Sequence, residues 1–296
     1  MSLPLAFVSV ILIWSTTPLA IKWSALGVSF SFALFSRMAI GTLLCMALLA
    51  ALRIRVPLHR KARRAYLASG LSLFGAMSLT YWSAQYVSSG LISVLFGLSP
   101  LITSLGAVLW LEEEALTANK LLGMLLGLAG LGLVFQGGLT LGAGALWGIL
   151  ALVAAVATQS IGLVWIKRIG DDSHPLAMTL GTLVVALPLF CAAWWLADGS
   201  VPTAMPQRAL IATAYLGVFG SVLGFMLYFY MIKHMEAGRV ALITLITPVM
   251  ALLLGHGLNN EAVLPQVWFG TAFILLGLGL HRWGLRWAAL PLGGRR

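Results

Sequence analysis

The chain has 296 residues, of which 60% are hydrophobic and only 9% are charged, whereas a soluble domain carries about a quarter charged residues. So few charges exclude a water-soluble globular domain, and the mean hydropathy of +1.00 indicates an integral membrane protein. The formal net charge of +10 does not indicate nucleic-acid binding, because no basic face with interleaved aromatic residues accompanies it.

Polar and turn residues divide the chain into apolar runs long enough to cross a bilayer, which takes about 20 residues. The first run has no basic segment before it and no small-residue cleavage site, which favours a retained span over a signal peptide. An all-α membrane protein is therefore expected. Its ten helices are predicted at residues 3–23, 31–52, 64–86, 90–111, 118–136, 142–167, 175–197, 207–231, 238–258 and 264–286.

Lysine and arginine are unequally distributed between alternate loops. Fifteen fall on one side of the membrane, six of them in the loop 53–64, whereas the loops on the other side hold only Lys22 and Arg208. Cytoplasmic loops carry the excess of Lys and Arg in membrane proteins. Both termini are therefore predicted to be cytoplasmic.

The two halves of the sequence resemble each other. Pro100 lines up with Pro248 at a shift of 148 residues, and the segments "EALTANKLLGMLLGLAGLGL" and "EAVLPQVWFGTAFILLGLGL" share eight of twenty positions. Five helices per unit is an odd number, so the second copy enters the membrane from the opposite side, as in transporters with inverted repeats. We expect two inverted five-helix repeats, 1–137 and 138–296, in one transmembrane domain.

Pro100 and Pro248 fall near the middle of their predicted helices, close to the bilayer centre. A proline inside a helix frees the carbonyl four residues before it, here those of Phe96 and Thr244. A freed carbonyl in lipid is costly, so we expect the two kinks to frame a central substrate cavity. Two tolerated kinks, satisfied by neighbouring hydroxyls, are the alternative.

Several motifs characterise the chain. They are "WSTTPLAIK" in the first helix, a Gly-to-Pro spacing of ten in the fourth and ninth helices, a glutamate after each of these, and the pattern G-x6-G-L-G-L, which occurs twice. On these motifs the whole chain resembles the drug/metabolite transporter superfamily, in its ten-helix EamA-type branch. Within that branch it is most similar to YddG-type aromatic amino acid exporters of bacterial inner membranes, by general similarity.

The resemblance implies that the first to fourth and sixth to ninth helices surround a central cavity, with the fifth and tenth helices outside. Glycines in the fifth helix, which permit close helix contact, suit that position. The resemblance also implies the inner membrane as location. The sixth helix departs from the pattern, with Gln159 where the first helix has Trp14, which leaves open how each half contributes to the cavity.

The central candidates for substrate contact are Trp14 and Gln159. Trp14 lies away from the interfacial belts where tryptophan is usual, so it either stacks on an aromatic substrate or packs between helices. Gln159 carries a buried amide that needs partners, on a neighbouring helix or on a substrate. The candidates at helix ends, which line a vestibule or belong to an aromatic belt, are Tyr81, Trp82, Gln85 and Tyr228.

A hydroxyl directly precedes a helix proline three times. The pairs are Thr17-Pro18, Ser99-Pro100 and Thr247-Pro248. Hydroxyls beside a freed carbonyl suit a zwitterionic substrate, whereas hydrogen bonding back to their own helix is the alternative.

Arg37 lies within the second helix, where a charge is a functional candidate, although it is near enough to the membrane surface to snorkel. We favour snorkelling.

All eight acids, by contrast, fall in loops or at helix ends. Proton-driven carriers usually rely on buried carboxylates or histidines, so facilitated diffusion is expected. The sequence has no P-loop and no nucleophile–base arrangement, so neither a cofactor nor an enzyme activity is expected.

The leading hypothesis is a secondary transporter that exports small amphipathic metabolites, aromatic amino acids first among them, by alternating access. A broad-specificity drug or metabolite exporter coupled to protons is the alternative within transport, and a static channel is the alternative outside it. The expected partners are a small-molecule substrate and the lipid bilayer. The oligomeric state stays open, with a monomer as one option.

Overall fold

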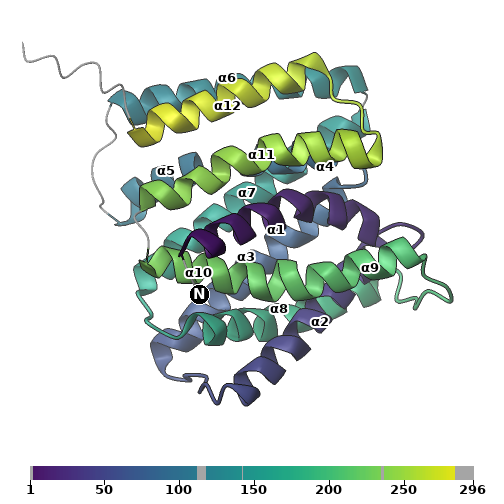
Figure 1. Ribbon diagram of the computed structural model, residues 1–296, viewed down its shortest axis with the longest axis vertical. Helices are drawn as coiled ribbons and strands as arrows, with labels where there is room; N and C mark the ends of the chain where they lie inside the picture. The colour runs from purple at the N-terminus through teal and green to yellow at the C-terminus, as the bar shows by residue number, and fades with distance from the viewer. Residues whose placement is uncertain (1–2, 112–117, 142, 235–236, 284–296) are drawn as a thin grey trace, which may run out of the picture.

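A computed structural model describes residues 3–111, 118–141, 143–234 and 237–283, and within them every element is a helix (Figure 1). The elements are α1 (Leu3–Ser24), α2 (Phe30–Ala51), α3 (Arg60–Ser83), α4 (Ser89–Phe96), α5 (Ser99–Leu111), α6 (Ala118–Leu141), α7 (Ala143–Ile169), α8 (Pro175–Ala197), α9 (Gln207–Tyr215), the π-helix η1 (Leu216–Leu223), α10 (Gly224–His234), α11 (Ala237–Asn259) and α12 (Pro265–Trp283).

Two of the ten predicted spans are divided in the structure. The span 90–111 forms α4 and α5, and the span 207–231 forms α9, η1 and α10. The predicted start of the third helix at residue 64 is wrong, because α3 already begins at Arg60. His59 caps this helix, since its Nδ1 accepts a hydrogen bond from the N–H of Ala62 at 3.2 Å. Part of the basic loop therefore belongs to the first turn of α3.

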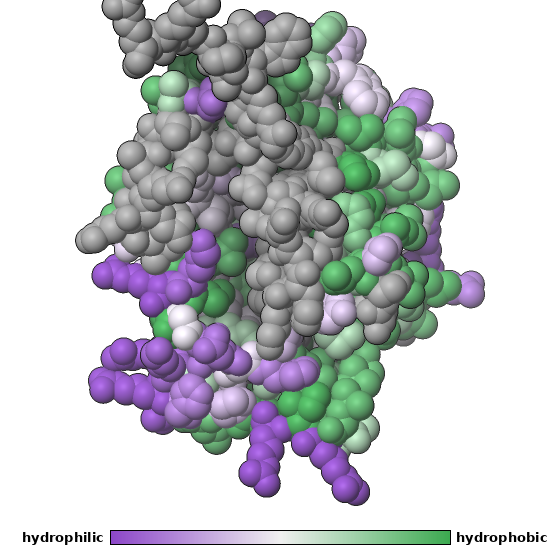
Figure 2. Space-filling view, turned by 60° about the vertical axis from the view of Figure 1, so that its left-hand side comes forward, coloured by the Kyte–Doolittle hydropathy of each residue, from purple (hydrophilic) through white to green (hydrophobic). Residues whose placement is uncertain are grey.

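The surface of the helices is that of a membrane protein. Six helical segments of the described chain are long and apolar enough to cross a membrane, and three shorter apolar segments accompany them. Large hydrophobic side chains such as Leu12, Leu43 and Leu276 are more than half exposed on the flanks, which is the surface expected of a bundle surrounded by lipid. Figure 2 shows hydrophilic side chains gathered toward one end and hydrophobic side chains on the flank beside it.

Helices of the first half pack mainly against helices of the second. Around the bundle, α1 contacts α11 and the α9–η1–α10 stretch, α2 contacts α8 and η1, α3 contacts α7 and α8, α4 contacts α11, and α5 contacts α7. The chain thus forms one interleaved body, in which every site between helices draws on both halves.

At one edge of the molecule, α6 and α12 lie against each other, beside α11 (Figure 1). Glycines bring their backbones together, because a Cβ added at Gly130 would lie only 2.6 Å from the carbonyl oxygen of Gly270. These two helices, the fifth and tenth of the predicted spans, stand at the outside of the bundle, where the resemblance places them.

Candidate functional site

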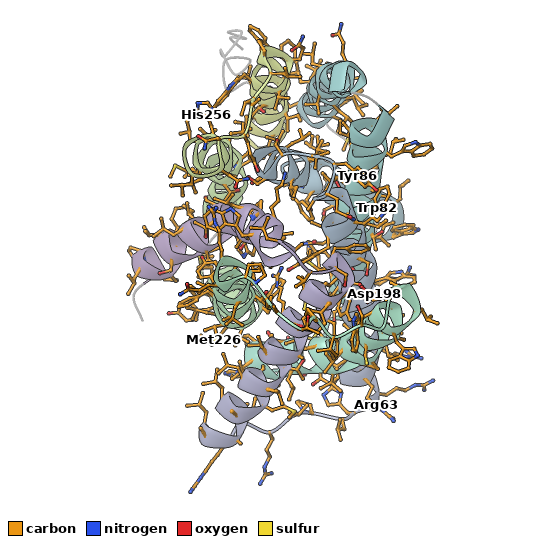
Figure 3. All side chains as sticks on the ribbon, turned by 90° about the vertical axis from the view of Figure 1, so that its right-hand side faces the viewer. Arg63, Trp82, Tyr86, Asp198, Met226 and His256 are labelled. Atoms are coloured by element: carbon orange, nitrogen blue, oxygen red, sulfur yellow. The ribbon has the colours of Figure 1, made fainter. Side chains whose placement is uncertain are left out.

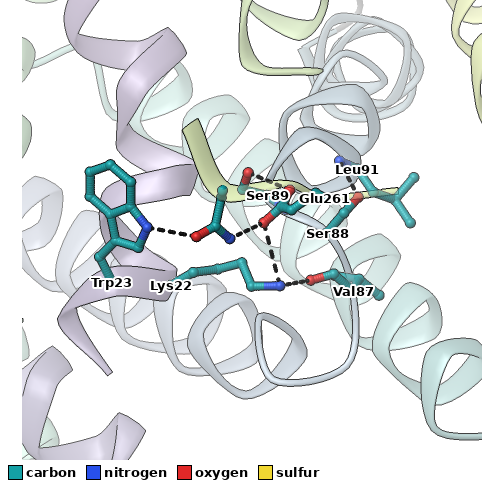
Figure 4. A network of polar contacts seen from close by, with 8 residues as sticks. Lys22, Trp23, Val87, Ser88, Ser89, Leu91 and Glu261 are labelled. Carbon is teal, nitrogen blue, oxygen red and sulfur yellow. Dashed lines mark hydrogen bonds and ion pairs between the residues drawn. The ribbon is translucent and has the colours of Figure 1, made fainter. Parts of the chain in front are cut away.

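A polar network surrounds Glu261 at the end of the bundle that we predict to be periplasmic (Figure 4). Lys22, in the last turn of α1, places its Nζ 3.6 Å from Oε1 of Glu261 and donates to the carbonyl of Val87 at 2.8 Å. The other carboxylate oxygen, Oε2, accepts hydrogen bonds from the N–H and the hydroxyl of Ser89, both at 2.8 Å. Because the first N–H groups of a helix lack partners and its N-terminus is positive, Glu261 stabilises the start of α4.

The network continues sideways to α9. Asn259, at the end of α11, donates to Glu261 at 2.9 Å and accepts a hydrogen bond from the indole N–H of Trp23 at 2.9 Å. The guanidinium of Arg208 lies 3.9 Å above the Trp23 ring, a cation–π contact. The side chain of Glu261 is only 8% exposed, so these partners supply the counter-charge and hydrogen bonds that a desolvated carboxylate needs. Helix ends from both halves are thereby held together.

Next to this network, the two proline-containing stretches pack closely. A Cβ added at Gly90 would lie 2.8 Å from the Cα of Leu252, and one at Gly97 would lie 3.7 Å from Cγ of Pro248. α4 ends at Phe96, so the kink expected at Pro100 is a break between two helices, whereas Pro248 lies inside the continuous helix α11.

The residues whose carbonyls these prolines free are only partly described. Phe96 is half-buried against the main core, and no hydrogen bond to its carbonyl is found among the described turns and helix ends. The side chain of Thr244 lies outside the described residues. The expectation that both carbonyls face a cavity therefore stays a prediction.

The three hydroxyls that precede prolines differ in what they bond. Thr17 and Thr247 each donate to the carbonyl four residues earlier, at 2.7 and 2.9 Å, which is the hydrogen bonding within the helix that we gave as the alternative. Ser99 instead pairs with the hydroxyl of Ser160 on α7 at 3.1 Å. Pro18, like Thr17, lies inside the continuous helix α1. Of the three hydroxyls, only Ser99 links two helices.

Trp14 and Gln159 lie on different helix pairs. Trp14 on α1 is half-buried and packs against the hydrophobic cluster of α1 and α10 that contains Leu227 and Met231. A Cβ at Gly224 would lie 3.2 Å from its Nε1, so the indole lies close to the backbone of α10. Gln159 on α7 is half-buried. Its amide has no hydrogen bond among the described residues, so its role in substrate contact stays a prediction.

The candidates at helix ends do not gather in one place. Tyr81 is 1% exposed within the main core, and its hydroxyl finds no partner in the described part of the chain. Trp82 is half-buried, its ring 4.9 Å from that of the exposed Tyr86, and Figure 3 shows both on the same side of the bundle. Gln85 is exposed and donates to the carbonyl of Trp82 at 3.1 Å. The side chain of Tyr228 lies outside the described residues.

Arg37 points into the bundle, so the snorkelling that we favoured from the sequence is wrong. Arg37 is only 3% exposed. Its Nε donates a hydrogen bond to the hydroxyl of Ser221 in η1 at 3.0 Å. Glycines make this approach possible, because a Cβ at Gly220 would lie 3.1 Å from Nη2 of Arg37. The signal in the sequence was the run "LGVFGSVLG", with three glycines inside one predicted span.

Two other contacts were not predicted from the sequence. The hydroxyl of Tyr215 lies 2.6 Å from that of Thr16, which connects α9 to α1. Lys22 and Glu261 were recognised only as members of repeated motifs, and their pairing depends on how α1 meets α11. The corresponding residues of the other half include Glu114, which lies outside the described residues.

Comparison with known proteins gives a consistent result. A model of the EamA-like transporter family matches residues 1–136 and again 146–282. The uncharacterized inner membrane transporter YedA of Escherichia coli K12 is 27% identical over 286 residues, which cover 93% of this chain and 89% of that protein. A probable amino-acid metabolite efflux pump of the same organism is 26% identical over 183 residues, 59% of this chain and 61% of that one. One crystal structure superposes with a TM-score of 0.66 at 21% identity, over 95% of this chain and 97% of that chain, which shows a shared fold.

Proposed function

Because the chain belongs to the EamA-like transporter family, we propose that this multi-pass inner membrane transporter exports small amphipathic metabolites by alternating access. Aromatic amino acids are the first substrates to test. The family and its relatives are transporters rather than enzymes, and the name of one relative refers to efflux of amino-acid metabolites. A small-molecule substrate and surrounding lipid follow from membership of the family.

The observation that carries the mechanism is the Lys22–Glu261 network. Alternating access needs a contact that holds one end of the bundle together and can be released. This ion pair joins the end of α1 to the α11–α12 loop, and Glu261 also holds the start of α4. A pair that is partly accessible to water, with Lys22 26% exposed, can separate at a smaller cost than a fully buried pair. We infer that it forms the gate at the periplasmic end.

The repeat suggests what happens at the opposite end. The family model matches the two halves separately, which supports five-helix repeats at 1–137 and 138–296. In such an alignment Lys167 and Glu114 correspond to Lys22 and Glu261. Inverted repeats place corresponding residues at opposite ends of the membrane. The proposed cytoplasmic gate is therefore a contact between Lys167 and Glu114.

The polar groups between the helices support a substrate without strong net charge. Ser99, Ser160 and Gln159 offer hydroxyl and amide groups on α5 and α7, and Trp14 offers an aromatic face on α1. The acids that the structure describes lie in loops. Membrane-embedded acids usually carry protons in coupled carriers, so the proposal is facilitated diffusion of the substrate down its own gradient.

Counterflow in proteoliposomes tests this function. Vesicles loaded with each of the twenty amino acids are diluted into labelled phenylalanine, and saturable counterflow that aromatic amino acids support best is the expected result. Linear, non-saturable flux would indicate a channel and contradict the proposal. Uphill transport driven by an imposed pH gradient would instead favour the proton-coupled exporter of broad specificity.

Reporter fusions test the orientation on which the gate assignment depends. Reporters inserted near residue 60 and fused after Arg296 are expected in the cytoplasm, and one near residue 200 in the periplasm. Opposite sides for residues 60 and 296 would contradict the arrangement of two inverted five-helix repeats.

A further inference from the structure

We propose that Arg37 binds the carboxylate group of the transported substrate at the contact between α2 and η1. The inference rests on the proposed function and adds to it a charged recognition residue and a class of ligand, organic carboxylates that include amino acids. Arg37 lies about two turns from the start of α2, on the side that faces η1, and its partner Ser221 is fully buried.

The guanidinium is a buried cation whose hydrogen bonding is incomplete. It has five N–H donors, and among the described residues it makes one hydrogen bond, from Nε to Ser221. Its Nη1 is buried and finds no partner there. The ion pairs of the described chain are Lys22–Glu261 and His59–Asp171, so no described acid neutralises Arg37. A buried charge without a counter-charge strongly destabilises a fold, which indicates that a further anionic group binds here.

The backbone opposite Arg37 is shaped for such a site. η1 is a π-helix, as the hydrogen bond from the N–H of Gly224 to the carbonyl of Phe219, five residues earlier, shows. Segments of this type are rare and often occur at functional sites. Gly220 places no side chain against the guanidinium, and a Cβ there would lie 3.1 Å from Nη2 and 3.7 Å from Cζ. The two terminal nitrogens are therefore not covered by a side chain from this position.

A carboxylate is the group that these features fit best. Nη1 and Nη2 of a guanidinium form two parallel hydrogen bonds with the two oxygens of a carboxylate, and Nε is already used by Ser221. The charge of the ligand would also neutralise the buried cation. A cation or a neutral amide supplies neither the charge nor the second acceptor oxygen.

The experiment compares two ligands that carry a carboxylate with one in which a neutral amide replaces it. Thermal unfolding of the purified full-length protein in detergent is measured with phenylalanine, phenylalaninamide and 3-phenylpropionate, and the same compounds are tested as inhibitors of phenylalanine counterflow. In the wild type, the two carboxylates should raise the Tm and inhibit, and phenylalaninamide should do so at least about tenfold more weakly, the ratio that one charge-assisted hydrogen bond supplies.

Substitution at Arg37 should remove this preference. Arg37→Gln is expected to bind the acid and the amide equally, and Arg37→Lys to recover part of the preference through its charge. Arg55→Gln, which removes an exposed loop cation, is the matched control and should keep the wild-type preference. Gly220→Ala keeps the charge but displaces the guanidinium, so it should weaken carboxylate binding alone.

The outcomes separate this inference from the proposed function. If Arg37→Gln weakens acid and amide binding equally, or if no carboxylate raises the Tm of the wild type, Arg37 only connects α2 to η1 and the inference is wrong. If the wild type shows no counterflow but carboxylates still raise its Tm through Arg37, the transport proposal fails and the binding site stands.

Discussion

The stretches that contain Pro100 and Pro248 correspond in the repeat and lie side by side, yet their conformations differ. The first is broken between Phe96 and Ser99 into α4 and α5, and the second is the continuous helix α11 (Figure 1). Both prolines remove a backbone donor and crowd the preceding turn. Proline alone therefore does not decide whether the helix breaks.

We attribute the difference to the residue three positions before each proline. Gly97 stands in the first stretch and Leu245 in the second. Glycine disfavours a helix by about 1 kcal/mol relative to alanine, whereas leucine is among the better helix formers. Gly97 and Pro100 both disfavour the helical conformation of the same turn, whereas in the corresponding turn of α11 only Pro248 does so. Two stretches that differ in this way can bend differently, which is the asymmetry that the proposed alternating access would use.

The largest expected effect is that of replacing the first proline. Pro100→Ala should allow α4 and α5 to join, because alanine is preferred over proline in a helix interior by about 3 kcal/mol. The variant should fold at least as well as the wild type and transport at least about tenfold more slowly, a barrier increase of about 1.4 kcal/mol. Pro248→Ala, in an already continuous helix, is the matched control with a smaller loss. Counterflow rates and Tm values of both variants measure this, and equal rates in all three proteins would show that the prolines are only tolerated kinks.

The second-largest effect is expected from a substitution that disrupts the Glu261 network. Glu261→Gln removes the ion pair with Lys22 and weakens the bonds to Ser89, so the start of α4 should separate more often from α11. In a background without Cys45 and Cys191, a cysteine at the buried position Leu91 should react several-fold faster with an impermeant reagent added outside. A partly exposed ion pair contributes up to about 1 kcal/mol, which corresponds to a roughly fivefold change.

Two variants control this measurement. Asp198→Asn, which changes an exposed acid at the same end, should leave the labelling unchanged. Lys22→Gln should accelerate it, and the double variant with Glu261→Gln should go no further, since both residues belong to one pair. Additive effects of the two substitutions would contradict the gate.

A glycine placed three residues before the second proline should transfer the helix break to the second half. Leu245→Gly gives α11 the same two weak positions as the first stretch and should cost about 1 kcal/mol of stability. Hydrogen exchange at the amides after Pro248 should become faster, while Gly97→Ala should slow exchange between α4 and α5. Unchanged exchange in both variants would mean that packing, and not the local sequence, determines the break.

The smallest effect is expected from the hydroxyls. Ser99→Ala removes the hydroxyl–hydroxyl bond between α5 and α7 and leaves the one that Ser160 donates to the carbonyl of Ser99, so it should cost about 1 kcal/mol, the net value of a typical hydrogen bond. Thr247→Val removes a hydroxyl that bonds only within its own helix, so Tm and counterflow should stay close to wild type. A larger loss with Thr247→Val than with Ser99→Ala would show that the second proline stretch, rather than the first, contacts the substrate.

The sequence by itself determined where the helices lie and what kind of protein they form. An apolar run must be long enough to cross a bilayer, and polar or turn residues must separate such runs, so the spans can be read without knowing how they pack. The repeated motifs likewise pointed to the transporter family that comparison then showed. The shift of the start of α3 to Arg60 depends on a local cap at His59, which the charge pattern concealed.

Only the tertiary structure decided which polar groups meet. Lys22 reaches Glu261, Arg37 reaches Ser221 and Ser99 reaches Ser160 across contacts between helices of opposite halves. Helices that face lipid on one side and other helices on the other are apolar all around, so their sequences carry little periodicity to show which face points inward. Long-range packing therefore fixes the candidate site, because no short stretch of the chain contains both partners of any of these contacts.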